Sequence, residues 1–259
     1  VVSQDEDQPS INSVHLAVEA GGNLLTVEGA NGHTLHTLGV SLLMPAPVTA
    51  DAMISLKQVQ KLQKALAESG AQVMQLYADP EREPKDRKET PPRRLYLVWT
   101  NADGAEVEAR VRLTEGTYPT ISRIIPQEPA QQTISVSVKA MLEALKKLKT
   151  VEPFKIAIET EAEEPASLEL TAITYDGNEL STRVPCTWEG DALGTLVDPA
   201  YLEANLKAQP EDAASLELRY RVNDDGKVCN CEAMVFRSGT LVAVTMPMLD
   251  AKGGCRWQR

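Results

Sequence analysis

The chain has 259 residues, of which 42% are hydrophobic, 24% charged and only 4% aromatic. This length and composition suit two soluble domains with aliphatic cores. The formal net charge of -11, taken alone, argues against a nucleic-acid coat protein. The sequence contains no apolar run of about 18 residues and no signal-peptide pattern, so we expect a cytoplasmic protein without a membrane partner.

The first half predicts strands, one helix and further strands. Ser55 and Gln58 form a capping-box pattern that opens the helix, and the charged, proline-rich segment 79–93 predicts a mobile loop. The apolar face of the helix consists of Leu56, Val59, Leu62 and Leu66. Alternating apolar residues predict strands at 14–18, 24–27, 33–38, 95–100 and 106–113.

The stretch 116–126 is the expected joint between two similar halves. A glycine and two prolines prevent a helix from running through it, whereas its three isoleucines are too apolar for a solvated linker. We therefore expect an extended connector packed on a domain. The resulting division is 1–126, 127–250 and a tail at 251–259.

The second half repeats this plan with two helices. Ser137 is expected to cap a helix that runs to residue 149, and Asp198 with Pro199 is expected to open a helix over 201–207. The buried stripe of the first helix consists of Val138, Met141, Leu142, Leu145 and Leu148. Strands are predicted at 132–136, 154–159, 167–174, 179–185, 214–222, 228–237 and 241–246.

The two halves align at an offset of about 145 residues, which indicates an internal duplication. Gly32 and Gly177 differ by 145 positions, and the helix caps Ser55 and Asp198 differ by 143. Subtracting 145 from the helix at 137–149 gives positions at or before the first residues. We therefore expect the first half to lack its opening helix, which would leave the face formed by Leu56, Val59 and Leu62 short of an apolar neighbour.

Five stretches carry a resemblance to one protein family. They are VSQDEDQPSINSV at 2–14, GANGHTL at 29–35, the connector GTYPTISRIIP at 116–126, DPAYL at 198–202 and VTMPM at 244–248. In this order and spacing they resemble the middle and C-terminal domains of the bacterial DNA polymerase III beta subunit, the sliding clamp.

The resemblance implies an α+β fold of tandem DNA-clamp domains, each with helices packed on antiparallel sheet, that associate into a ring. It implies a non-catalytic processivity factor without cofactors, located in the cytoplasm with the nucleoid. Its partners would be duplex DNA, held topologically and without sequence preference, further copies of the chain, and short peptide motifs of replicative and repair polymerases and of the clamp loader.

Two sets of site residues follow from this resemblance. The helices would face DNA with a set of lysines whose positions reconcile the acidic chain with a DNA partner: Lys57, Lys61, Lys64, Lys139, Lys146, Lys147 and Lys149. A peptide-binding groove carried over from the family comprises Ile11, Ala30, Gly32, His33, Thr34, Leu35, Pro126, Val244, Met246, Pro247 and Met248.

Three departures from the family motifs keep a second function open. Thr34 stands where the motif usually has Arg, Asn31 stands for Asp, and Leu249 stands for the Arg after Met-Pro-Met. Two of these changes remove a cation from the expected groove. The alternative is a clamp-like interaction or regulatory protein that has lost ring closure or standard peptide docking.

Other candidate sites are weaker. His33 and His36 could suggest a metal pair, but strand alternation would place them on opposite faces. The cysteines at 229 and 231 have no second ligand pair at a zinc-site spacing, and the acidic run 159–164 suits a solvated loop. The sequence contains no phosphate-binding loop, nucleophile elbow or catalytic acid pair, so we expect no enzyme.

Overall fold

The computed structural model describes residues 10–71, 73–78, 94–161, 166–192, 194–222 and 228–248. The chain forms two compact units. We call the one made of Val2–Gly32 and Gly39–Pro119 the N-terminal unit, and the one made of His33–Leu38 and Thr120–Arg259 the C-terminal unit. The predicted loop 79–93, the predicted tail 251–259 and the first nine residues lie outside the described part of the chain.

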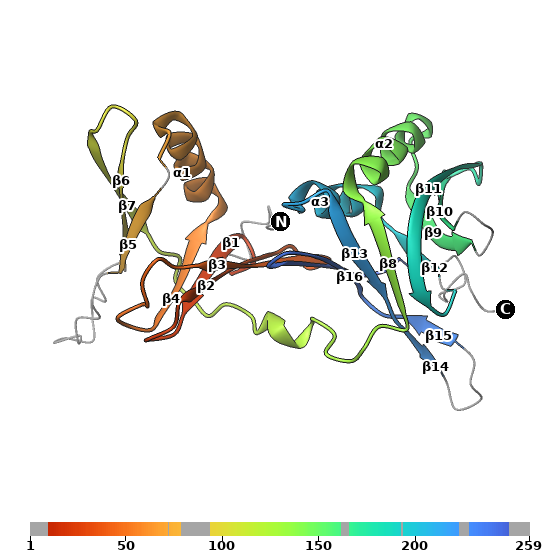
Figure 1. The fold of residues 1–259 in the computed structure, drawn as a ribbon, viewed down its shortest axis with the longest axis horizontal. Coiled ribbons are helices and arrows are strands. Elements are labelled where there is room, and N and C mark those ends of the chain that lie inside the picture. The colour runs from red at the N-terminus through yellow and green to blue at the C-terminus, as the bar shows by residue number, and fades with distance from the viewer. Residues whose placement is uncertain are drawn as a thin grey trace. The chain divides into compact units, whose positions relative to one another are not determined.

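The N-terminal unit has one helix and two antiparallel groups of strands, ordered β2-β1-β4 and β5-β6-β7 (Figure 1). Its elements are β1 Ser13–Val18, β2 Leu24–Ala30, β4 Ala50–Ser55, α1 Leu56–Ser69, β5 Met74–Ala78, β6 Arg94–Thr100 and β7 Glu106–Arg112. The intervening strand β3, Thr34–Ser41, is shared, because its residues up to Leu38 cluster with the C-terminal unit.

Helix α1 lies on a small aliphatic core. Val59, Leu62 and Leu66 pack, half-buried, against a cluster whose buried members are Ile54, Leu95, Leu97, Trp99 and Val111. The helix ends at Gly70, whose φ of 65° is the left-handed conformation that favours glycine. Ser55 precedes the helix as expected, but its Oγ donates to Gln58 Oε1 at 3.2 Å and makes no cap to the backbone, so only half of the predicted capping box forms.

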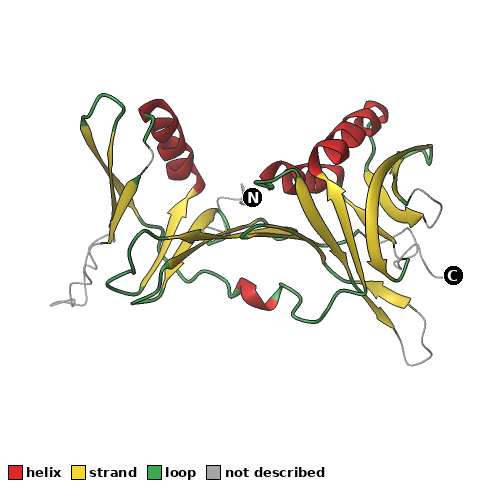
Figure 2. Cartoon of the chain, in the orientation of Figure 1, coloured by secondary structure: helices red, strands yellow, loops and turns green. Residues whose placement is uncertain are grey.

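The C-terminal unit wraps one antiparallel sheet around two helices (Figure 2). Its strand order is β12-β9-β10-β11-β8-β13-β16-β17-β3, and β14 and β15 form a separate pair. The bounds are β8 Gln132–Ser137, α2 Val138–Leu148, β9 Lys155–Glu161, β10 Ser167–Ile173, β11 Glu179–Gly190, β12 Gly194–Val197, α3 Pro199–Ala208, β13 Ala213–Leu218, β14 Tyr220–Val222, β15 Val228–Cys231, β16 Met234–Ser238 and β17 Leu241–Thr245.

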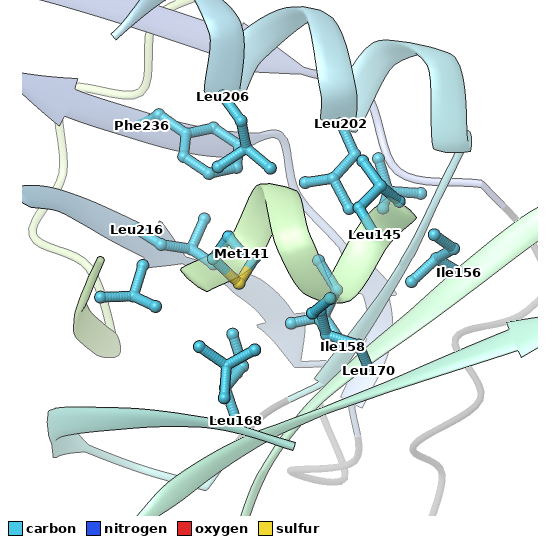
Figure 3. Close-up of a cluster of buried hydrophobic side chains, with 14 of the residues drawn as sticks. Met141, Leu145, Ile156, Ile158, Leu168, Leu170, Leu202, Leu206, Leu216 and Phe236 are labelled. Atoms are coloured by element: carbon cyan, nitrogen blue, oxygen red, sulfur yellow. The ribbon is translucent and has the colours of Figure 1, made fainter. Parts of the chain in front are cut away.

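The core of the C-terminal unit lies between these helices and the concave side of the sheet (Figure 3). Met141, Leu145 and Leu148 of α2 have exposed fractions of 0–1%, which confirms the predicted helical stripe except at half-buried Leu142. Leu202 and Leu206 of α3 are also fully buried. Complete burial of a leucine side chain contributes about 1.5–3 kcal/mol, so two helices make this core extensive.

Both helix caps predicted in the second half are present. The Ser137 hydroxyl accepts from Ala140 N at 3.2 Å, and Asp198 Oδ1 accepts from Ala200 N at 2.7 Å and from Tyr201 N at 3.3 Å. Pro199 occupies the first turn of α3. The sequence therefore fixes where each of these helices begins, because each cap satisfies amide groups that have no partner within the helix.

The two units repeat one order of elements, as the duplication predicts. The series β1, β2, β4, α1, β5, β6, β7 corresponds to β9, β10, β12, α3, β13, β16, β17. In each unit a residue just after the last strand donates to the strand before the helix: Thr114 N to Met53 O, and Met248 N to Leu196 O, both at 2.8 Å. The C-terminal unit has β8 and α2 in addition, before the repeated series.

Several strands differ from the sequence-based prediction. β5 and β12 were not predicted, and β4 begins at Ala50 within the segment assigned to a proline-containing connector. The strand predicted at 228–237 divides into β15 and β16. β11 extends to Gly190 because its second half pairs with β8, and Gly190 must be glycine, since a Cβ there would lie 1.9 Å from Gln131 O.

The connector is packed, as predicted, and contains one short 3-10 turn, Ile121–Arg123. Tyr118 and Ile121 are buried at 8% and 3% exposure, whereas Ile124 is 47% exposed. Tyr118 stacks on His15 with ring centroids 4.4 Å apart. None of the described helices is both long and apolar enough to cross a membrane.

Candidate nucleic-acid and peptide interfaces

Helix α1 presents a basic face. Lys57, Lys61 and Lys64 are all exposed, on the side of the helix away from half-buried Leu62 and Leu66. With the single acidic residue Glu68, the helix carries three lysines and one carboxylate, in a chain whose net charge is -11. The positive charge is therefore concentrated where the sequence predicted it.

Helix α2 has a similar charge distribution. Lys139, Lys146 and Lys147 are exposed, whereas Met141 and Leu145 on the opposite side are buried. Glu143 is the only acidic residue of the helix. Lys146 and Lys147 lie in the last turn, where cations also interact favourably with the helix dipole.

Lys149 differs from the other lysines of the predicted set. It lies beyond α2, in the 3-10 turn Lys149–Val151, and its Nζ is 2.6 Å from Glu203 Oε2. The other oxygen of Glu203 is 2.7 Å from Lys207 Nζ. Hydrogen bonds from these two lysines hold the pKa of Glu203 below its usual value. One carboxylate thus partly neutralises Lys149, which makes it the weakest candidate for a phosphate contact.

Part of the predicted peptide groove lies within the C-terminal unit, where β3 pairs with β17. Leu35 is opposite Val244 and Thr34 is opposite Thr245, and the His33 carbonyl accepts from Met246 N at 2.9 Å. Thr34, Leu35 and Val244 are buried at 1–3% exposure. These strands therefore bring together two predicted segments, 33–35 and 244–246, that are far apart in the sequence.

The end of β17 offers apolar side chains to solvent. Met246 is 47% exposed, and Pro247 and Met248 are half-buried. Methionine is flexible and polarisable, and suits a surface that accepts several linear motifs. Pro126 is half-buried in the connector, and its place beside these residues stays a prediction.

A buried polar network fixes β3 against α3. His36 Nε2 lies 2.6 Å from Asn205 Oδ1, and Asn205 Nδ2 donates to the Thr245 hydroxyl. Burial lowers the pKa of His36 to about 4, against the opposing effect of its Asn205 hydrogen bond. The imidazole is therefore neutral near pH 7, and its Nε2–H donates to the amide oxygen.

The expectation that His33 and His36 point to opposite faces is wrong. His33 stacks on Tyr201 with centroids 5.5 Å apart, and His36 contacts Asn205, one turn further along the same helix. Alternation fails because His33 precedes β3 and follows Gly32, whose φ of 86° turns the chain. Within the part of the chain described, no group of three His, Cys, Asp or Glu side chains is placed to hold a metal.

Tyr201 is a candidate site residue that the sequence analysis did not select. Half-buried, it stands beside exposed His33 at the start of α3. The DPAYL stretch was used only as a helix start. An aromatic residue one turn after a strong cap, on the exposed side of its helix, was the available signal.

The remaining predicted groove residues lie in the N-terminal unit. Ile11 is half-buried, Ala30 is 7% exposed, and Gly32 is exposed. Ala30 ends β2, and Gly32 belongs to the turn that follows. Their convergence with the C-terminal residues stays a prediction. Among the cysteines, Cys186 is a free, half-buried thiol, and burial raises its pKa.

No protein-family model matches the sequence, and none of the curated proteins matches it. Solved structures do. The chain is similar to a DNA polymerase III beta subunit from Thermotoga maritima, with a TM-score of 0.70 and 18% identity over 97% of this chain and 61% of that one. It is also similar to a DNA polymerase III beta chain from Streptococcus pneumoniae (TM-score 0.75, 13% identity, 96% of this chain and 60% of that one).

A third similar structure is the DNA polymerase sliding clamp from Bacillus subtilis, with a TM-score of 0.72 and 17% identity over 96% of this chain and 60% of that one. The chain thus spans about three-fifths of the length of these proteins. The described helices lie on antiparallel sheet in both units, in agreement with the predicted fold class. The chain therefore has the fold of the DNA polymerase III beta subunit, the bacterial DNA sliding clamp.

Proposed function

We propose that the protein is a DNA sliding clamp, a non-catalytic processivity factor that associates into a ring around duplex DNA in the cytoplasm. The observation that carries this proposal is the charge distribution: exposed lysines concentrate on α1 and α2 of a chain whose net charge is -11. A ring that retains DNA topologically requires only weak, non-specific phosphate contacts, which exposed lysines provide by releasing counterions.

The test is the salt dependence of DNA binding. Replacing Lys57, Lys61 and Lys64 together with Ser should lower the slope of log affinity against log salt by up to roughly three units, since each phosphate contact contributes about 0.9. Fluorescence anisotropy with two unrelated duplexes measures the slope and confirms that sequence preference is unchanged.

Matched variants separate charge from other effects of the substitutions. The triple Lys→Arg variant at the same positions should keep the parental slope because it keeps the charge. Replacing Lys149 and Lys207 with Ser should change the slope less, since both are paired with Glu203. A triple Ser variant with the parental slope would show that the lysines of α1 are only a solvated face.

We propose further that the groove around β3, β17 and α3 binds short polymerase and clamp-loader peptides. Exposed Met246, half-buried Met248 and the stacked pair His33 and Tyr201 support this, because they combine adaptable apolar surface with an aromatic anchor. Met248→Asp should abolish binding of a clamp-motif peptide, as measured by anisotropy, without unfolding the protein. Met44→Asp is the matched control, because Met44 is 77% exposed and belongs to the N-terminal unit.

A clamp-like regulatory protein is the second candidate. The observation that favours it is Thr34, which occupies the usual Arg position and is only 3% exposed, so it offers a partner neither charge nor accessible surface. DNA binding and self-association without any affinity for clamp-motif peptides would support this candidate over the first.

A further inference from the structure

The side of β1 and β2 that faces α1 is apolar and incompletely covered. Val14 and Leu16 of β1 and Leu25 and Val27 of β2 are each half-buried. Leu16 packs against the small core under α1 and pairs in register with Val27. We call these four side chains the β1–β2 face.

The corresponding side chains of the C-terminal unit are completely buried. Ile158 pairs with Leu170 as Leu16 pairs with Val27, so the two hairpins align residue by residue. The counterparts of the β1–β2 face are therefore Ile156, Ile158, Leu168 and Leu170, and each has an exposed fraction of 0%. Chemically similar aliphatic faces thus differ in what lies over them.

Helix α2 accounts for the difference. In the C-terminal unit α2 and α3 lie together on the sheet, whereas in the described part of the N-terminal unit α1 is alone (Figure 1). Met141, Leu145 and Leu148 of α2 belong to the same core cluster as Ile158 and Leu168. The α3 residue Leu202 is 0% exposed, whereas Val59, its counterpart 143 positions earlier, is half-buried.

From this comparison we infer that the β1–β2 face is a docking site for an amphipathic helix with aliphatic residues at the spacing of Met141, Leu145 and Leu148. Such a helix would complete the N-terminal unit as α2 completes the C-terminal unit, by burying apolar surface on the sheet and along α1. The inference rests on the duplication within the chain and is independent of the proposed clamp function.

The test uses the full chain and a labelled synthetic peptide with the chain's own α2 sequence, residues 137–150. We expect saturable binding by fluorescence anisotropy. An isolated helix of this length is marginal in water, so part of the binding energy is spent on ordering it. A peptide with M141E and L145E, which interrupts the apolar stripe, should bind at least about tenfold more weakly.

Adjacent leucines supply the matched protein variants. Leu25 belongs to the β1–β2 face, whereas Leu24 points the other way and is 49% exposed. Leu25→Ser should weaken peptide binding about tenfold or more, and Leu24→Ser should leave it unchanged.

Hydrogen exchange with the wild-type chain locates the peptide even if Leu25→Ser does not fold. Slower exchange in residues 13–30 and 56–69 on peptide addition supports the inference. Absence of saturable binding, or slower exchange confined to the C-terminal unit, would overturn it. DNA binding is measured separately, so that either proposal can fail alone.

Discussion

Helices α1 and α3 occupy equivalent places in the two units but differ in burial. Leu202, Asn205 and Leu206 of α3 are 0% exposed, whereas Leu62, the counterpart of Asn205 at the same offset of 143, is half-buried. Each helix lies on antiparallel sheet, but only α3 has α2 beside it within the described residues. The burial of an apolar face is therefore determined by the next element in the layer as much as by the helix itself.

The largest expected difference is in the cost of truncating a leucine. Leu202→Ala should destabilise the C-terminal unit by about 2–5 kcal/mol, because it opens a cavity in a fully packed core. Leu62→Ala should cost the N-terminal unit clearly less, since Leu62 is already partly solvated. Hydrogen exchange followed by mass spectrometry measures both units in one sample. Equal costs would contradict the difference in packing.

The C-terminal unit should also lose stability in acid through His36. Its pKa of about 4 in the folded protein is below the usual 6.5, so the stabilisation is complete above about pH 6.5 and is lost as the pH falls toward 4. The shift corresponds to a loss on the order of 3 kcal/mol. Urea unfolding followed by the fluorescence of Trp188, with the other tryptophans replaced by Phe, measures it. In a His36→Gln background this acid dependence should disappear.

A somewhat smaller effect is expected when α3 is made to resemble α1. Asn205→Leu introduces the residue found at the equivalent position in α1, and leaves the Nε2–H of His36 and the Thr245 hydroxyl without their partner. The cost should be about 1–3 kcal/mol for each buried group left unsatisfied. The reciprocal change, Leu62→Asn, serves as control and should cost less, because a half-exposed amide remains hydrated. A neutral Asn205→Leu would show that the network is dispensable.

The smallest effect is expected at His15 in the N-terminal unit, and its sign is opposite. Burial alone would lower the pKa of His15, but hydrogen bonds and charge from Glu28, at 2.8 Å, and Asp51, at 3.2 Å, raise it above 6.5. This stabilisation is present below pH 6.5 and is lost as the pH rises through the folded-state pKa. Trp99 fluorescence during urea unfolding should show it, and His15→Gln should remove it.

The sequence was sufficient for the elements that announce themselves locally. Ser137 and Asp198 have cap chemistry, and the stripe of α2 has a clear helical period, so both C-terminal helices were predicted at their observed starts. The clamp fold was recognised from short stretches placed in order, and its solved relatives agree. The lysines of α1 and α2 are exposed as expected, while their contact with DNA stays a prediction.

The features that were missed depend on distant partners. β12 is four residues long and is specified by its pairing with β9, and β5 has no regular alternation of burial to reveal it. The pairing of His33 with Tyr201, and of Lys149 with Glu203, joins residues 168 and 54 positions apart (201 minus 33, 203 minus 149). Local periodicity carries no information about such contacts.

The division of β3 between the units has a consequence for the timing of synthesis. Leu35 pairs with Val244, which is made 209 residues later (244 minus 35). At about 5–20 residues per second, roughly 10–40 s separate the appearance of these two residues. During that interval β3 is on the ribosome without the strand that completes its pairing, and its buried residues Thr34 and Leu35 have no β17 to cover them. The nascent chain therefore depends on its last strand to finish what its third strand begins.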